Sequence, residues 1–283
     1  MKLGKSSVRH FFLSLVAVFL LSACTNQFAY NTLPFWIDYY LSDYIDTTPA
    51  QQKQLDADLE KFHEWHRQNE LPKIQALLNK LEADMAKPMS YSRIGDYHHL
   101  VNARIKGSLE GLTPTLVNLI SSMSDEQAQI WLDMVNKNIE EAIKEANEGS
   151  EDEQRVRRQE RLVERAEFWV DSVNAKQKKQ FLEMAGYQIG MRPVFYSIRD
   201  ELMTELEGIL MDRYTSDLGD RINAYFAHLI AFQSEQYEND MALYLARRYE
   251  LLQRLDRHLS EKQRTTMRKK LASYSEDITA VLN

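Results

Sequence analysis

Apolar residues recur at helical spacing along most of the chain, which predicts amphipathic α-helices and not strands. Leu71, Ile74, Leu78 and Leu81, for example, stand three or four residues apart and therefore share one helix face. Runs of alternating β-branched residues, which would indicate strands, are absent from the sequence. We therefore expect an all-α fold, built as an antiparallel multi-helix bundle of about eight to ten helices.

Polar capping residues and helix breakers set the expected boundaries of these helices. The residues expected to begin helices as N-caps are Thr48, Ser90, Ser124, Asn174 and Ser260. Gly149-Ser150 should interrupt the chain before a charged helix, and the stretch from Gly186 to Pro193 should hold a kink or turn.

Two further boundaries follow from proline and from apolar periodicity. Thr113-Pro114 is expected to begin a short helix, because proline is well tolerated in a first helical turn, so the preceding helix should end near Glu110. The apolar residues from about Asp217 to Arg257 keep one helical period throughout. We expect a single long helix there.

One motif opens four of the predicted helices: Ser, Thr or Asn, followed three residues later by Gln. Its occurrences are Thr48–Gln51, Ser124–Gln127, Asn174–Gln177 and Ser260–Gln263. This is the capping box, in which each side chain bonds the backbone of the other residue, and each cap stabilises its helix by about 1 kcal/mol. The spacing between occurrences is irregular, which excludes a solenoid of fixed period.

The first 24 residues have the layout of a secretion signal. Lys2, Lys5 and Arg9 precede the apolar run of residues 11–21, which is too short to span a bilayer comfortably. The run ends in Leu-Ser-Ala-Cys, which resembles the lipobox of bacterial lipoproteins. That resemblance implies a signal peptide over residues 1–23, cleavage before Cys24, and a lipidated Cys24. The alternative is an ordinary signal peptide with a chance cysteine.

The surroundings of Cys24 bear on where the protein resides. Cys24 is the only cysteine, so no intramolecular disulfide can form. Thr25 follows it where an Asp would signal retention in the inner membrane, so the resemblance implies the periplasmic face of the outer membrane. Two or more acyl chains anchor a protein stably, since each buried methylene contributes about 0.8 kcal/mol.

The charge balance narrows the class of partner. Cleavage before Cys24 would remove Lys2, Lys5, Arg9 and no acid, which shifts the formal net charge from −7 to −10. An acidic chain is a poor non-specific ligand for nucleic acid or for anionic lipid heads. We expect the membrane, through Cys24, and an unknown envelope protein as partners, and no nucleic acid.

An aromatic-rich segment, residues 24–47, is expected between the anchor and a single all-helical domain, residues 48–283. Trp36, Tyr40 and Tyr44 stand four residues apart and would form one helical stripe. One interpretation is that this stripe packs on the bundle. The other is an interfacial belt near the bilayer, since Trp and Tyr favour that zone.

The sequence His-Glu-Trp-His-Arg is the strongest candidate for chemistry. His63 and His66 stand three residues apart with Arg67 and Glu70 close behind, which predicts a polar cluster. The metalloprotease motif needs its histidines four residues apart, and a metal would also need a third ligand, such as His98 or His99. We therefore expect no metal, no cofactor and no catalytic residues, because nucleophile-elbow, phosphate-loop and dinucleotide motifs are also absent.

Two resemblances bear on function. The capping motif is similar to the Leu-Thr-x-x-Gln motif of small periplasmic helical chaperones and stress-response proteins of the Spy and CpxP type. Residues 30–52 and 62–78 resemble a family of uncharacterised Gram-negative outer-membrane lipoproteins. The residues that carry this second resemblance are Tyr30-Asn31, Trp36, Gln51, Trp65-His66-Arg67 and Glu70-Leu71-Pro72. It implies a helical, membrane-anchored periplasmic protein and assigns no activity.

Together these features favour a protein that acts by binding and not by catalysis. The leading hypothesis is a scaffold, adaptor or chaperone-like binder of envelope proteins. The alternatives are an envelope hydrolase whose active site the sequence does not locate, or a carrier of a hydrophobic ligand. The sequence suggests the carrier only through its eleven methionines and many aromatic residues.

Overall fold

The computed structural model describes residues 30–283, and within them the all-α fold is confirmed. The described part contains no strand, and one short 3-10 helix, η2 (Glu235–Tyr237), accompanies the α-helices. The α-helices are α3 (Leu33–Leu41), α4 (Pro49–Asn69), α5 (Leu71–Asp84), α6 (Tyr91–Ser122), α7 (Asp125–Ala146), α8 (Glu151–Val170), α9 (Ala175–Gly190), α10 (Arg192–Met211), α11 (Leu218–Ala231), α12 (Glu238–Arg257) and α13 (Glu261–Leu282).

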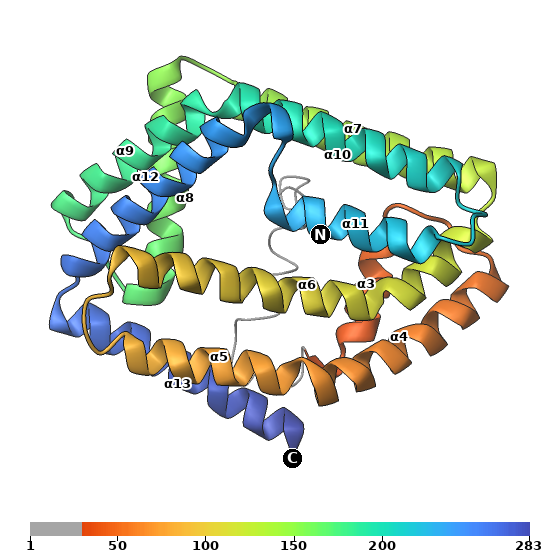
Figure 1. Cartoon of the computed structure of the whole chain (residues 1–283), viewed down its shortest axis with the longest axis horizontal. Coiled ribbons are helices and arrows are strands. Elements are labelled where there is room, and N and C mark those ends of the chain that lie inside the picture. Colours follow the sequence, from red (N-terminus) through yellow and green to blue (C-terminus); the bar gives the residue numbers. More distant parts are fainter. Residues whose placement is uncertain (1–29) are drawn as a thin grey trace, which may run out of the picture.

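Helix α6 runs through the middle of the molecule, with α4 packed on one side and α11 on the other (Figure 1). Helix α5 lies beside α13 along one edge, and α7 lies beside α10 along the opposite edge. Helices α8, α9 and α12 gather at one end. Within residues 30–283, no helix combines the length and hydrophobicity needed to cross a membrane.

The largest apolar core lies where α3, α4, α6, α7, α10 and α11 meet. Its buried members come from these helices and the adjoining turns, and they include Leu59, Leu119, Met123, Ala128, Leu210 and Ile222. The aromatic segment joins this core through Leu33, Ile37 and Ile45. Of the stripe expected there, Tyr44 packs against the core whereas Trp36 is exposed.

The expected helix start at Thr113-Pro114 is wrong, because α6 continues unbroken from Tyr91 to Ser122. Pro114 cannot donate a backbone hydrogen bond to the carbonyl four residues earlier, which normally kinks or ends a helix. Here its neighbours Thr113 and Thr115 are buried, and α6 is held between α4 and α11. Packing on both sides therefore keeps the helix continuous.

The single helix expected from Asp217 to Arg257 is also wrong. Helix α11 stops at Ala231 because Phe232 adopts the left-handed conformation, with φ 46° and ψ 55°. Its ring lies 5.8 Å from that of Phe195 on α10. The chain resumes as α12 only at Glu238, so packing of one aromatic residue accompanies a break that apolar periodicity does not reveal.

The chain repeats its architecture. Helices α4 and α9 both begin with capping boxes. Each is followed, after one residue, by a helix with proline in its first turn, namely α5 and α10. Farther along the chain, α7 and α13 again begin with capping boxes. The first half comprises α4 to α7, and the second comprises α9 to α13. The last helix of each half packs against the other half, because α13 packs against α5 and α7 packs against α10. The two halves are therefore interlocked and do not stand side by side.

Two glycines lie at contacts between the halves, one near each end of α6. A Cβ atom built on Gly95 of α6 would lie 3.6 Å from the Tyr249 ring on α12. A Cβ built on Gly219 of α11 would lie 3.6 Å from Val117 on α6. Each half thus places a small residue, near the start of its third segment, against a side chain of the other half.

Candidate functional site

The best-defined polar site holds Tyr30 against the buried histidine of α4. The Tyr30 hydroxyl lies 3.1 Å from His66 Nδ1, and His66 Nε2 lies 3.2 Å from the Ser108 hydroxyl on α6. His66 is only 1% exposed. One imidazole therefore joins the N-terminal segment to two central helices.

His63 and Arg67 enclose the same tyrosine from the next turns of α4. The His63 ring centroid lies 4.7 Å from that of Tyr30, and the Arg67 guanidinium carbon lies 5.8 Å from the Tyr30 ring centroid. Arg67 also donates a 3.0 Å hydrogen bond to the Asn31 side chain. We call Tyr30, Asn31, His63, His66 and Arg67 the tether site.

Glu70 does not join the tether site, although the sequence placed it with these residues. Its carboxylate is 3% exposed and accepts hydrogen bonds from Lys73 at 2.6 Å and from Arg104 of α6 at 3.1 Å. A Cβ on Gly107 would lie 2.9 Å from Glu70 Oε2. Glycine is therefore the residue that lets α6 approach this carboxylate.

Burial sets the protonation of the tether site. It lowers the pKa of His66 to about 4, with a smaller effect from neighbouring His63. Burial also lowers the pKa of His63, helped by the positive charge of Arg67, and it raises the pKa of Tyr30. Both imidazoles are therefore neutral near pH 7, so the tyrosine is held by neutral hydrogen bonds and ring contacts.

The histidines are not arranged as metal ligands. Among residues 30–283, no group of three or more His, Cys, Asp or Glu side chains is placed to hold a metal ion. Both ring nitrogens of His66 face hydroxyl groups. His98 instead bonds the Tyr249 hydroxyl on α12 and lies 3.2 Å from the amide of Asn102.

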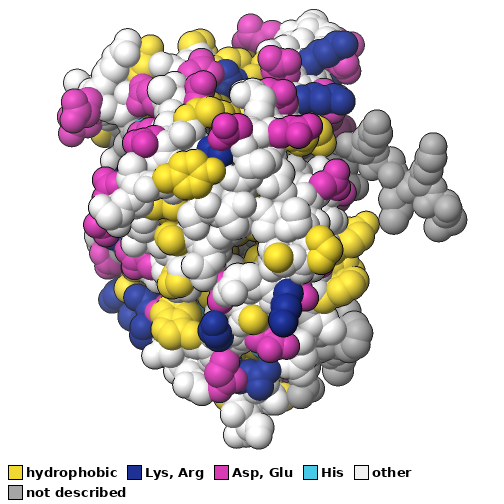
Figure 2. All heavy atoms as spheres, turned by 90° about the vertical axis from the view of Figure 1, so that its right-hand side faces the viewer, with side chains coloured by type: hydrophobic (Ala, Val, Ile, Leu, Met, Phe, Trp, Pro, Cys, Tyr) yellow, Lys and Arg dark blue, Asp and Glu magenta, His cyan; other side chains and the backbone are white. Residues whose placement is uncertain are grey.

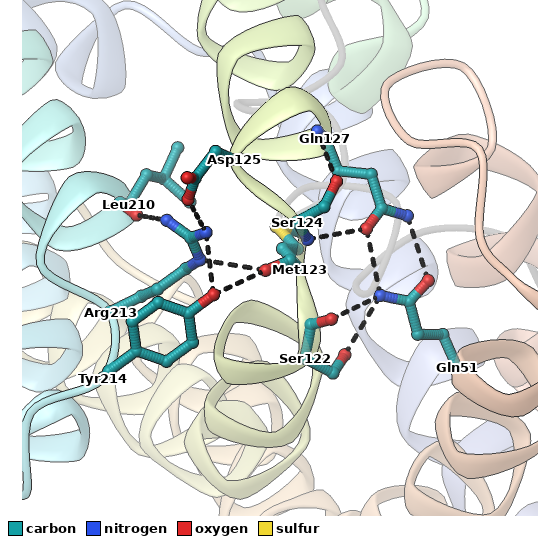
Figure 3. Close-up of polar contacts among 9 residues, drawn as sticks. All are labelled: Gln51, Ser122, Met123, Ser124, Asp125, Gln127, Leu210, Arg213 and Tyr214. Atoms are coloured by element: carbon teal, nitrogen blue, oxygen red, sulfur yellow. Dashed lines mark hydrogen bonds and ion pairs between the residues drawn. The ribbon is translucent and has the colours of Figure 1, made fainter.

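A second polar site joins the starts of α4 and α7 (Figure 3). Gln51 Nε2 donates to Gln127 Oε1 at 3.1 Å, and Gln127 Nε2 donates back to Gln51 Oε1 at 2.9 Å. Gln51 Nε2 also reaches the Ser122 carbonyl at 2.8 Å, at the end of α6. The glutamine of each capping box thus caps its own helix and also binds the other box, 76 residues away.

The other two capping boxes form a matching pair. Gln177 and Gln263 exchange amide hydrogen bonds of 3.2 and 3.0 Å across 86 residues. Gln263 also donates to the Ser172 carbonyl at 2.7 Å. The four Gln capping boxes therefore form two pairs. One pair joins α4 to α7, and the other joins α9 to α13, which are the first and last helices of each half.

Arg213 closes the first of these junctions from the opposite side (Figure 3). Its side chain, 1% exposed, donates to the Met123 carbonyl at 3.1 Å and to the Leu210 carbonyl at 2.8 Å. It also pairs with Asp125 in the first turn of α7. The guanidinium thereby fixes the end of α10 to the turn between α6 and α7.

Some of these residues had a sequence signal and others had none. Cys24 lies outside the described residues, so its predicted lipidation stays a prediction. Tyr30-Asn31 was visible only as part of a resemblance, and its packing on Trp65-His66-Arg67 places two parts of that pattern in contact. The tertiary role of Arg213 gave no local signal, because its partners Met123 and Asp125 lie about 90 residues earlier in the chain.

A depression lies between α4 and α6. Its volume is about 170 Å³, below the range of roughly 300–1,000 Å³ typical of small-molecule sites. The carboxylate in its lining, Asp58, already accepts hydrogen bonds from Gln54, Lys61 and Asn118. These bonds lower the pKa of Asp58 although burial opposes them as the largest single influence, so the group is not poised to donate a proton at neutral pH.

Comparison with known proteins gives one match. Residues 43–206, more than half of the 283, match DUF6279, described as a family of unknown function. No curated protein and no solved structure matches the chain. The match includes Gln51, Gln127 and Gln177 and the α4 residues that hold Tyr30. The chain therefore belongs to the DUF6279 family of unknown function.

Proposed function

We propose that this protein is a lipid-anchored periplasmic helical protein of the outer membrane, and that it acts by binding another envelope protein as a scaffold, adaptor or chaperone-like binder. The observation that carries the proposal is the docking of Tyr30 on buried His66. Tyr30 follows Cys24 by only six residues. A chain extends at most about 3.3–3.6 Å per residue, so a lipidated Cys24 would hold the body within about 20 Å of the bilayer.

The described polar groups support binding over catalysis. His66, Glu70 and Arg213 are buried, and each is engaged by partners that join helices. The 170 Å³ depression is small and the oxygens of its carboxylate are already bonded, so this depression does not itself support a hydrolase or carrier site. A group that acts on a substrate needs access and a perturbed protonation state suited to the reaction.

The surface also suits a protein partner. Figure 2 shows hydrophobic, acidic and basic side chains intermixed on one face of the molecule, without a continuous field of one sign. Exposed apolar residues on this molecule include Ile130 on α7, Met211 at the end of α10 and Leu243 on α12. Interfaces between proteins typically combine apolar centres with polar rims.

Photo-crosslinking in intact cells tests the proposal. A photoreactive amino acid placed at position 130, 211 or 243 should give a discrete protein adduct from one of these surfaces. Cys24→Ser, which removes the acceptor thiol, should abolish both lipidation by mass analysis and the adduct. Ala86→Ser, at an exposed position just after α5, is the matched control, because it keeps Cys24 and leaves the tether site unchanged.

A purified-protein assay complements the cellular one. Light scattering of an unfolding client would show whether the protein suppresses aggregation. A mature chain with an unmodified sulfur at Cys24 would contradict the anchor. Absence of both adducts and client protection would contradict the binding function.

A further inference from the structure

The outward face of α3 carries three neighbouring aromatic side chains that are exposed. Phe35, Trp36 and Tyr39 are 61%, 39% and 52% exposed. Their ring centroids lie 5.5 to 6.3 Å apart, so they form one connected patch. We call these three residues the aromatic patch.

The exposure of the aromatic patch is not a sign of a loosely attached helix. On the opposite side of α3, Leu33 and Ile37 are each 8% exposed and belong to the main core. The charged residue of α3, Asp38, accepts a 2.7 Å hydrogen bond from Gln52 of α4. Helix α3 therefore turns its aliphatic and acidic groups toward the body and its aromatic groups outward.

We propose that the aromatic patch inserts into the interfacial zone of the bilayer leaflet that holds the lipid of Cys24, an inference that rests on the proposed anchor. Phe35 follows Cys24 by eleven residues, and Tyr30, between them, is fixed to the body at His66. The lipid and the aromatic patch therefore belong to neighbouring parts of the chain. A helix with an aromatic outer face lies flat in such an interface, where the rings of Trp and Tyr are most stable.

The chemistry of the aromatic patch favours insertion into the interfacial zone of a lipid leaflet over electrostatic binding to anionic headgroups. Helix α3 contains no Lys or Arg, so it has no cation with which to attract negative headgroups. The Trp36 indole donates its N–H to the Thr32 hydroxyl at 3.2 Å, which leaves the ring face apolar. Two contacts, the lipid tail and the aromatic patch, would then fix the orientation of the body as well as its distance from the membrane.

Site-directed spin labelling of the lipidated protein in vesicles tests this inference. Cys24 is the only cysteine, and lipidation consumes its thiol, so an introduced cysteine is the single labelling site. Tyr39→Cys carries the label on the patch, and Leu243→Cys, 51% exposed on α12, is the matched control. The vesicles contain phosphatidylethanolamine and phosphatidylglycerol.

The label at position 39 should be several-fold more accessible to oxygen, relative to an aqueous nickel complex, than the label at position 243. Equal, water-like accessibility at the two positions would overturn the inference. Quenching by brominated lipids gives a second measurement on unlabelled protein. Lipid-dependent quenching of tryptophan fluorescence should be largely lost in Trp36→Phe, and undiminished quenching in that variant would also overturn the inference.

Vesicle flotation separates this inference from the function on which it rests. If the wild-type protein floats and position 39 remains aqueous, the aromatic patch proposal fails alone. If the wild-type protein carries no lipid and does not float, the anchor and the patch proposal fail together.

Discussion

Gln51 and Gln127 form a closed pair in which each side-chain amide donates to the other. Each glutamine also bonds the backbone of its own N-cap residue, Thr48 or Ser124, through the same oxygen. A local helix-start motif thereby also makes a tertiary contact, because the two side-chain amides can bond each other only when α4 and α7 begin side by side.

Breaking this pair should show coupling between its members. Gln51→Ala removes the donor to the Ser122 carbonyl and one partner of the Gln127 amide, which keeps its bond to the Asp46 carbonyl, and we expect a loss of about 2 kcal/mol in the free energy of unfolding. The loss of unfolding free energy in the double variant Gln51→Ala/Gln127→Ala should be smaller than the sum of the two single losses, by about 0.5 kcal/mol or more. Urea unfolding measures all three. Gln129→Ala, on the exposed side of α7, is the control, and strict additivity at 51 and 127 would contradict the pairing.

The buried imidazole of His66 should make the fold sensitive to mild acid. Its pKa is about 4 in the folded protein against about 6.5 in an unfolded chain, so the unfolded state binds the extra proton between these values. The free energy of unfolding should therefore be highest above pH 6.5 and should fall as the pH drops toward 4. His66 alone should account for a decrease on the order of 3 kcal/mol over this range. Thermal unfolding of wild type and His66→Gln from pH 7 to pH 4 measures the effect. Parallel curves for the two proteins would contradict it.

Gly111 and Gly190 should respond in opposite directions to alanine. A Cβ on Gly111 would lie 1.9 Å from the Trp65 ring, so Gly111→Ala should destabilise the protein by about 2 kcal/mol through overpacking. Nothing lies within 4 Å of a Cβ on Gly190, and Gly190→Ala should stabilise α9 by about 0.5 kcal/mol. Melting temperatures compare the two. Trp65→Leu should relieve the Gly111→Ala defect, and failure of that rescue would place the clash elsewhere.

Arg213 should tolerate no replacement, including lysine. Arg213→Met or Arg213→Lys leaves buried carbonyls of Met123 and Leu210 without a full set of donors, and we expect a loss of about 2–3 kcal/mol. Arg221→Met, which affects a more exposed arginine bonded to Asp212, should cost less than about 1 kcal/mol. Equal losses in chemical denaturation would show that burial of Arg213 is not the cause.

The helix starts could be predicted because their signals are local. Thr48, Ser124, Asn174 and Ser260 each bond the backbone three residues on, so a short window of sequence contains the whole interaction. Ser150 forms a further box with Glu153, which the sequence revealed only as a break.

The pairing of the caps and the continuity of the helices could not be predicted in this way. Gln51 meets Gln127 through a contact that spans 76 residues, and no local rule selects that partner. Pro114 and Phe232 mislead in opposite directions, because tertiary packing overrides the local preference of the backbone. In α3 nearly every position is apolar, so periodicity alone did not show that Ile37 faces the core and Trp36 faces outward.

The packing of α13 on α5 dictates when the protein can finish folding. Gln75 donates to the Ser275 carbonyl at 2.9 Å, and 200 residues separate them. As the chain is synthesised from its N-terminus, the apolar side of α5 stays uncovered until the final helix is available. Contacts of such long sequence separation slow folding and leave intermediates prone to aggregate. We therefore expect a chain that is truncated before α13 to aggregate or to be degraded.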